Sequence, residues 1–129
     1  MDAPGLIPSL IGAPLADRNG SMVATVEDLL VDERTHCPIW LLVRLRADAS
    51  PFTFVPAARL ASRAGCVAVP FEGDQIRAAP VRLAAPSDAA REHAVRLCRH
   101  YGLMAGPAWT ATATRLHPVR TAASVARAA

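Results

Sequence analysis

The feature that most restricts the fold of this sequence is a succession of short β-type segments within residues 10–80, each bounded by turn residues. The first boundary contains Asn19 and Gly20, and an Asn-Gly pair is the strongest short-range signal for a β-hairpin because both residues tolerate positive φ. Strands are predicted on either side of it, over residues 10–16 and 22–32. The whole succession predicts a mainly β domain of short antiparallel strands.

The clearest predicted strand spans residues 39–46, where alternate residues place a continuous apolar face on one side. That face consists of Ile39, Leu41, Val43 and Leu45. The opposite face starts with Trp40 and Leu42 and continues with arginines, so half of it is apolar as well. Such a face needs a cover, either the helix or tail of the same chain or a second subunit. If a subunit provides the cover, Trp40, Leu42 and Arg44 lie on an interaction surface.

Two further strands are predicted over residues 52–55 and 66–71, with a turn at residues 59–65 between them. Pro56 ends the first of these strands because it has no amide hydrogen to donate to a neighbouring strand. Residues 73–80 begin with a Gly-Asp pair and are predicted to form a short irregular segment.

A helix is predicted over residues 87–102, with Ser87 as its N-cap and Gly102 as the residue that ends it. Its apolar stripe consists of Ala90, Ala94, Leu97, Cys98 and Tyr101. The expected organisation is an N-terminal extension at 1–9, a β domain at 10–86, this helix at 87–102 and a tail at 103–129. The tail carries little bulky apolar surface, so we expect it to be poorly ordered.

The net charge of +3 is unevenly distributed along the chain. Residues 1–86 hold eight Arg and nine acidic residues, whereas residues 87–129 hold six Arg and two acidic residues. Any attraction to nucleic acid, an anionic membrane or an acidic protein therefore belongs to the C-terminal part. Trp109 and Arg115 are its candidate contacts, because an aromatic ring can stack on a base and a guanidinium can bind phosphate. The tail has only three Arg, which is too few for nucleic acid to be the expected partner.

No pattern in the sequence indicates a catalytic, metal or cofactor site. His93 and His100 lie seven residues apart on the predicted helix, roughly 10 Å along its axis, which is too far to bind one metal ion. The cysteines lack the paired spacing of a zinc site, and Cys66 and Cys98 are predicted to be small buried residues. Glycine-rich phosphate loops and nucleophile motifs are also absent from the sequence. We therefore expect no enzyme and no cofactor.

Cysteine usage and the N-terminal residues bear on the compartment. The three Cys form an odd and scattered set, unlike the framework of a secreted disulfide-rich protein. Asp2 and the lack of a basic stretch argue against a signal peptide, and no apolar run reaches the roughly 18 residues of a membrane span. A soluble, cytoplasmic protein is expected, with peripheral association with a membrane complex left open.

Four segments occur in an order that resembles the PRC-barrel family, namely GSMVATVEDLLVD, PIWLLVRLR, FVPAARL and VAVPFEGDQIRAAP. The resemblance extends over residues 10–83, with a departure at Ala24, where members often have Gly. The ending RHYGL is similar to a helix that follows the barrel in stand-alone bacterial members of the actinobacterial type. The resemblance implies a small β-barrel followed by one amphipathic helix.

The same resemblance bears on function, because the family is named after the cytoplasmic domain of the photosynthetic reaction-centre H subunit. Another member is the C-terminal domain of a ribosome-maturation factor. These are docking domains, so the resemblance implies a non-enzymatic interaction or assembly module that forms a homodimer and binds an unknown protein partner. A stress-related role is one interpretation. The alternative is an accessory factor that binds ribosomal protein or RNA through the barrel and the basic tail.

Overall fold

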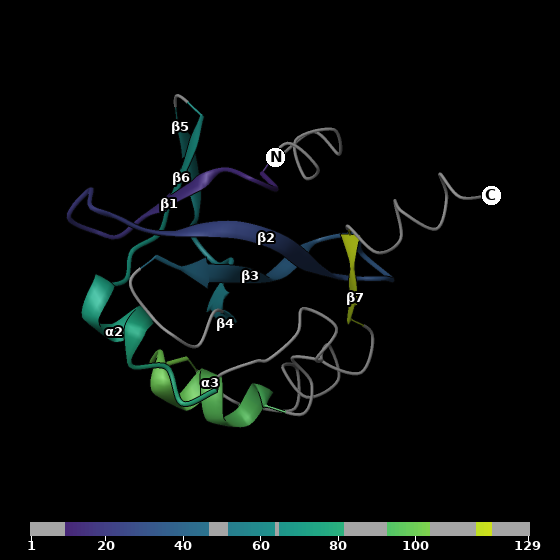
Figure 1. Ribbon diagram of the computed structural model, residues 1–129. Coiled ribbons are helices and arrows are strands. Elements are labelled where there is room, and N and C mark those ends of the chain that lie inside the picture. Colours follow the sequence, from purple (N-terminus) through teal and green to yellow (C-terminus); the bar gives the residue numbers. More distant parts are fainter. Residues whose placement is uncertain (1–9, 47–51, 64, 82–92, 104–115, 120–129) are drawn as a thin grey trace.

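The computed structural model of this chain describes residues 10–46, 52–63, 65–81, 93–103 and 116–119 (Figure 1). The strands within these residues are β1 Pro14–Ala16, β2 Met22–Asp32, β3 Pro38–Leu45, β4 Phe52–Pro56, β5 Ala61–Arg63, β6 Cys66–Ala68 and β7 Leu116–Pro118. The helices are α2 Gly73–Arg77 and α3 Ala94–His100. The prediction of a mainly β domain is confirmed.

All seven strands belong to one sheet, in the order β4-β3-β2-β1-β6-β5, with β7 paired to β2 outside this path. Every pair is antiparallel except β1 and β6, which run parallel, so the sheet is mixed rather than purely antiparallel. Two parallel strands need a long connection between them, and the chain from β2 to β5 supplies that connection between β1 and β6. Figure 1 shows α2 and α3 on the β4 side of the sheet, while the β5–β6 hairpin projects from the opposite side.

The longest strand, β2, has eleven residues and is paired along both of its edges. β3 follows one edge over most of its length, whereas the other edge carries β1 near its start and β7 at its end. The register with β3 shifts between Val26 and Asp28 and again between Leu30 and Val31, and such irregularities bend and twist a strand. Since β7 lies in the segment predicted as a loose tail, part of that segment joins the sheet.

The turn between β1 and β2 confirms the predicted hairpin but differs from it in geometry. Only Gly20 has a positive φ, at 87°, and Asn19 does not. The amide of Gly20 donates to the carbonyl of Asp17, and the amide of Asp17 donates to the carbonyl of Ser21. This is a four-residue turn, Asp17–Gly20, whose last residue is a left-handed glycine, an arrangement typical of hairpin loops longer than two residues. The Asp17 carboxylate also accepts from the Asn19 amide at 2.9 Å, which favours this turn.

The central side chains of β3, those of residues 40–43, are buried on both faces of the strand. Val43 on the predicted inner face is 0% exposed, and so are Trp40 and Leu42 on the opposite face. The Trp40 ring packs edge-on against Phe54 of β4, with the ring centroids 6.3 Å apart. The chain itself therefore covers the second face, which is the first of the two alternatives. Because Trp40 and Leu42 are both 0% exposed, they offer no apolar surface to a second subunit in this structure. The homodimer that the family resemblance implies stays a prediction.

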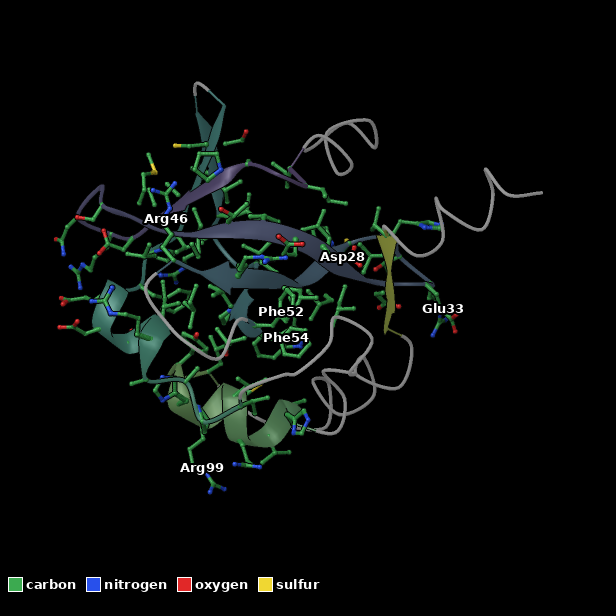
Figure 2. The ribbon with its side chains drawn as sticks, viewed as in Figure 1. Asp28, Glu33, Arg46, Phe52, Phe54 and Arg99 are labelled. Atoms are coloured by element: carbon green, nitrogen blue, oxygen red, sulfur yellow. The ribbon has the colours of Figure 1, made fainter. Side chains whose placement is uncertain are left out.

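α3 packs against the sheet through the apolar stripe that the sequence predicts. The buried members of the stripe are Ala94, Leu97, Cys98 and Tyr101. The hydroxyl of Tyr101 donates to the main-chain carbonyl of Phe54 in β4 at 2.9 Å. Figure 2 shows Phe54 between the sheet and α3, and Arg99 pointing away from the sheet. One apolar stripe and one buried hydrogen bond thus attach the helix to β4.

The C-terminal end of α3 is also as predicted. Gly102 has a φ of 74°, and the amides of Gly102 and Leu103 donate back to carbonyls in the last turn of the helix. This pattern is the common glycine-terminated end of a helix. The described helix begins at Ala94, and the predicted N-cap Ser87 lies outside the described residues.

Two short elements escape the sequence analysis. Residues 59–65, predicted as a turn, contain β5, and residues 73–80, predicted as irregular, contain α2. β5 has three residues and α2 has five, so neither is long enough to display a hydrophobic period. The last predicted strand also ends earlier than expected, at Ala68.

Replacing Val43 by Asp should unfold the domain. The change places an unpaired charge where the side chain has 0% exposure, which should lower the free energy of unfolding by at least about 3 kcal/mol. Arg46→Asp, at an exposed position just after the same strand, is the control and should retain cooperative unfolding. Urea unfolding followed by circular dichroism measures both, and wild-type stability of Val43→Asp would show that the inward face has been misassigned.

Replacing Tyr101 by Phe should lower the free energy of unfolding by about 1–2 kcal/mol, because the carbonyl of Phe54 would lose its buried donor. The ring and its contact with Phe71, at a centroid distance of 4.9 Å, are retained. Chemical denaturation of the two proteins side by side gives the difference. An unchanged midpoint would mean that this hydrogen bond does not attach α3 to β4.

Candidate functional site

An open groove with a volume of about 620 Å³ lies over β1, β5 and β6. Its lining consists of Ala16, Asp17, Arg18, Gly20, Met22, Arg59, Ala61, Cys66, Ala68, Val69 and Pro70. Two stretches that are distant in the sequence, residues 16–22 and 59–70, thus meet at one place. The groove combines an apolar floor with two exposed arginines, which makes it the candidate functional site.

The floor of the groove is a row of three alanines on β1, β6 and β5, and Met22 of β2 lies at the end of this row. Met22 pairs with Ala16, Ala16 with Ala68, and Ala68 with Ala61. The neighbouring residues Leu15 and Val67 also pair with each other and are 0% exposed. Successive residues of a strand point to opposite faces, so the large side chains fill the core while the alanines lie on the groove side, where Ala61 and Ala68 are half-buried and Ala16 is 4% exposed. Met22 stays 43% exposed beside this row.

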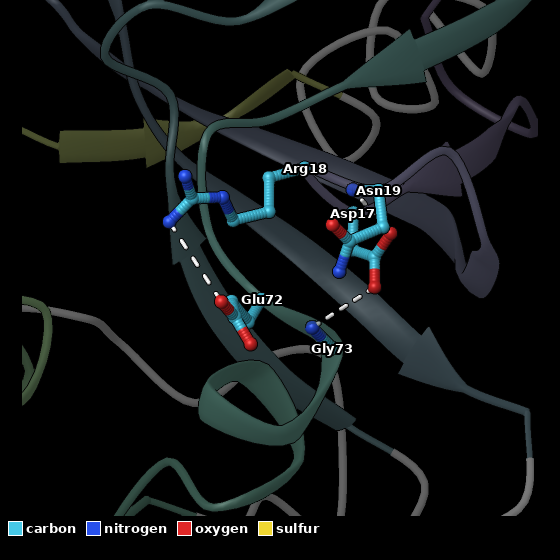
Figure 3. A network of polar contacts seen from close by, with 5 residues as sticks. All are labelled: Asp17, Arg18, Asn19, Glu72 and Gly73. Carbon is cyan, nitrogen blue, oxygen red and sulfur yellow. Dashed lines mark hydrogen bonds and ion pairs between the residues drawn. The ribbon is translucent and has the colours of Figure 1, made fainter.

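Arg18 and Arg59 supply the positive charge of the groove. The guanidinium of Arg18 lies 3.7 Å from the carboxylate of Glu72, and both side chains are more than half exposed (Figure 3). An exposed ion pair of this kind contributes little stability, typically 0–1 kcal/mol, so a carboxylate from another molecule can replace Glu72 at small cost. Arg59 has a φ of 63°, and within the described parts of the chain no acidic side chain forms an ion pair with it.

The wall of the groove is held in place by Asp17, which is only 7% exposed. Its Oδ1 accepts the amides of Asn19 and Ser21, each at 2.9 Å, and its Oδ2 accepts the amide of Gly73 at 3.1 Å. Figure 3 shows this last bond reaching from the hairpin turn to the start of α2. A Cβ atom on Gly73 would lie 3.0 Å from both Asp17 Oδ2 and Val23, so the close approach depends on glycine.

The bonding of Asp17 determines its charge state. Burial is the largest single influence and raises the pKa of this carboxyl, but the amides of Ser21, Asn19 and Gly73 and the charge of Arg77 together outweigh it. The net effect lowers the pKa below 3.8, so Asp17 is ionised at neutral pH. With both oxygens occupied by backbone donors, Asp17 is an anchor of the fold and is not free to act as a general base.

The remaining predicted contact residues are not gathered at this groove. Arg44 is exposed on β3, where its Nε donates to Glu27 at 3.0 Å and its guanidinium lies 5.2 Å from the centre of the Phe52 ring. Trp109 and Arg115 lie outside the described residues. The sequence analysis missed the groove because its floor depends on the β1–β6 pairing and on β5, which carry no readable signal.

The described residues also answer whether that part of the chain holds metal ligands, exposed thiols or a membrane-spanning helix. They contain no group of His, Cys, Asp or Glu side chains arranged to hold a metal ion. Cys66 lies at the groove, whereas burial raises the pKa of the Cys98 thiol within the core. Among these residues no helix has the length and apolar character needed to cross a membrane.

Comparison with protein-family models and with curated proteins finds no match for this chain. The resemblance to the PRC-barrel family therefore depends on the order of the sequence segments alone.

Replacing Asp17 by Asn should lower the free energy of unfolding by about 1–3 kcal/mol at pH 7, since an amide cannot accept from all three backbone donors. A carboxyl whose pKa is lowered by folding stabilises the folded state above its unfolded pKa of about 3.9, and this stabilisation is lost as pH falls through the folded pKa. The difference between wild type and variant should therefore shrink below about pH 4.

Urea unfolding at several pH values measures this difference. Glu33→Gln, at an exposed turn position, is the matched removal of a carboxylate and should leave the midpoint near that of the wild type. A stability difference that stays constant from pH 7 to the acid limit would contradict an ionised anchor at Asp17.

Proposed function

We propose that this chain is a non-enzymatic protein-interaction or assembly module of the PRC-barrel type. The observation that carries the proposal is the groove over β1, β5 and β6, which is lined by the half-buried Ala61 and Ala68, by Met22 at 43% exposure and by two exposed arginines. An apolar centre with a charged rim is the arrangement found in protein–protein interfaces. The segment order that resembles the family supports the same class of function.

The composition of the groove favours docking over catalysis. Its lining has one carboxylate, and that of Asp17 already accepts three backbone amides. It has one thiol, Cys66, and no His in the lining that could deprotonate it. General acid–base or nucleophilic chemistry needs such a partner within hydrogen-bond reach, so binding is the activity that these residues support best.

The alternative function is an accessory factor that binds ribosomal protein or RNA. The charge distribution favours it, because residues 87–129 carry six Arg and two acidic residues. Its proposed contacts include the tail residues Trp109 and Arg115. The two functions predict different surfaces, since docking would use the groove whereas the alternative would use the basic tail together with the barrel.

A variant that fills the groove tests the proposal. Ala68→Trp places a large ring on the floor, and Val95→Trp adds the same ring to an exposed position of α3. We expect a protein that is retained from native lysate by the wild type and by Val95→Trp but not by Ala68→Trp. Once purified, this protein should show the same preference in a binding titration, and a melting curve should establish that both variants are folded.

Two results would argue against docking at the groove. Equal retention by Ala68→Trp and the wild type would remove the groove from the binding surface. Retained material that disappears after ribonuclease treatment, and that depends on residues 104–129, would favour the alternative function.

A further inference from the structure

We propose that the groove binds an extended acidic peptide segment of a partner protein, with one carboxylate at Arg18, a second at Arg59 and an apolar side chain on the alanine floor between them. This inference rests on the proposed docking function and adds the chemical class of the partner. Its evidence is the placement of the two arginines relative to the row of alanines.

The charge of Arg18 favours a carboxylate as its ligand. A carboxylate of the same chain, that of Glu72, already lies 3.7 Å from this guanidinium. The position therefore accepts a carboxylate, and the exposure of both side chains leaves the pair open to exchange. Because Arg59 forms no ion pair with any acidic residue in the described parts of the chain, it is the stronger attractor of an incoming acid.

The spacing of Arg18 and Arg59 fits an extended segment. Arg18 follows β1 by two residues and Arg59 precedes β5 by two residues, and one strand, β6, lies between β1 and β5. Neighbouring strands are about 4.8 Å apart, so Ala16 and Ala61, which both pair with Ala68 and each lie two positions from one of the arginines, are roughly 10 Å apart. In an extended segment, side chains four residues apart point the same way and are about 13 Å apart, within reach of two flexible Arg side chains.

The shape of the floor leaves room for one apolar side chain between the two carboxylates. The residue halfway between two such carboxylates points in the same direction as they do, toward the groove. Ala16, Ala61 and Ala68 leave room for it, whereas larger side chains in the same row would fill the space. An acidic–x–apolar–x–acidic segment therefore matches the arginines and the alanine floor together.

Nucleic acid matches the groove less well. Binding to a single strand relies on aromatic platforms for the bases, and the lining contains no aromatic side chain. Affinity for the phosphate backbone also grows with the number of basic contacts, and the lining offers two arginines beside one buried carboxylate. The groove thus favours a segment that offers both carboxylates and an apolar side chain.

The test uses the full chain and a blocked heptapeptide of sequence Ser-Glu-Ser-Leu-Ser-Glu-Ser, titrated while backbone amide resonances are recorded by NMR. We expect saturable shifts at Ala61, Cys66 and Ala68, with a dissociation constant on the order of 0.1–1 mM for so short a ligand. Arg18→Gln and Arg59→Gln should each weaken binding about three- to tenfold. Arg99→Gln removes the same charge from an exposed position of α3 and should leave the affinity unchanged.

Peptide variants separate charge from shape. A peptide with Gln in place of both Glu should bind at least tenfold more weakly, and one with Ser in place of Leu should also lose affinity. The inference is overturned if the acidic peptide gives no saturable shifts at the groove. It is also overturned if the Gln peptide binds as tightly as the Glu peptide, or if Arg59→Gln binds the Glu peptide as tightly as the wild type does. Tighter binding of a single-stranded oligonucleotide to the groove would overturn it too. If the peptide fails while capture of a protein still depends on Ala68, docking stands and only the acidic partner is rejected.

Discussion

The pairing of β2 with β3 supports the rest of the structure. β2 carries β3 on one edge and β1 and β7 on the other, and β3 carries β4, so the remaining strands attach to this pair directly or through β1. β3 is buried on both faces, with Trp40, Leu41, Leu42 and Val43 all at 0% exposure. A strand of this kind cannot slip by one residue without moving buried side chains, so its position fixes the register of its neighbours.

Two buried hydrogen bonds attach the helices to this sheet. Asp17 holds the first residue of α2 against the β1–β2 turn, and Tyr101 holds α3 against β4. The first bond gives the amide of Gly73 a hydrogen-bond acceptor, and the second gives the carbonyl of Phe54 a donor. Buried backbone groups need such partners. Both bonds join residues more than 40 positions apart in the chain, so they bring distant segments together rather than stabilise local structure.

The groove is a consequence of the same sheet. Large residues of β1 and β6 face the core, and the alanines that alternate with them lie on the other face, where their small side chains leave a hollow. Asp17 then places Arg18 at one border of the hollow, because both residues belong to the turn that Gly73 contacts. The candidate site is therefore built from residues that also support the fold, with the exposed side chains of Arg18 and Arg59 at its border.

The sequence by itself determined the hairpin, the strands over residues 22–32 and 39–46, and the glycine-terminated end of α3. In each case the signal is local, since an alternating pattern or a left-handed glycine needs only a few neighbouring residues. Tertiary structure alone decided the parallel pairing of β1 with β6, the existence of β5 and α2, and the cover over Trp40 and Leu42. A half-apolar strand face requires a cover but does not specify it, because the hydrophobic effect has no direction and any apolar surface can supply it. Phe54 and α3 lie far along the chain from most of the residues they meet, so only the folded sheet could show that this chain covers its own strand.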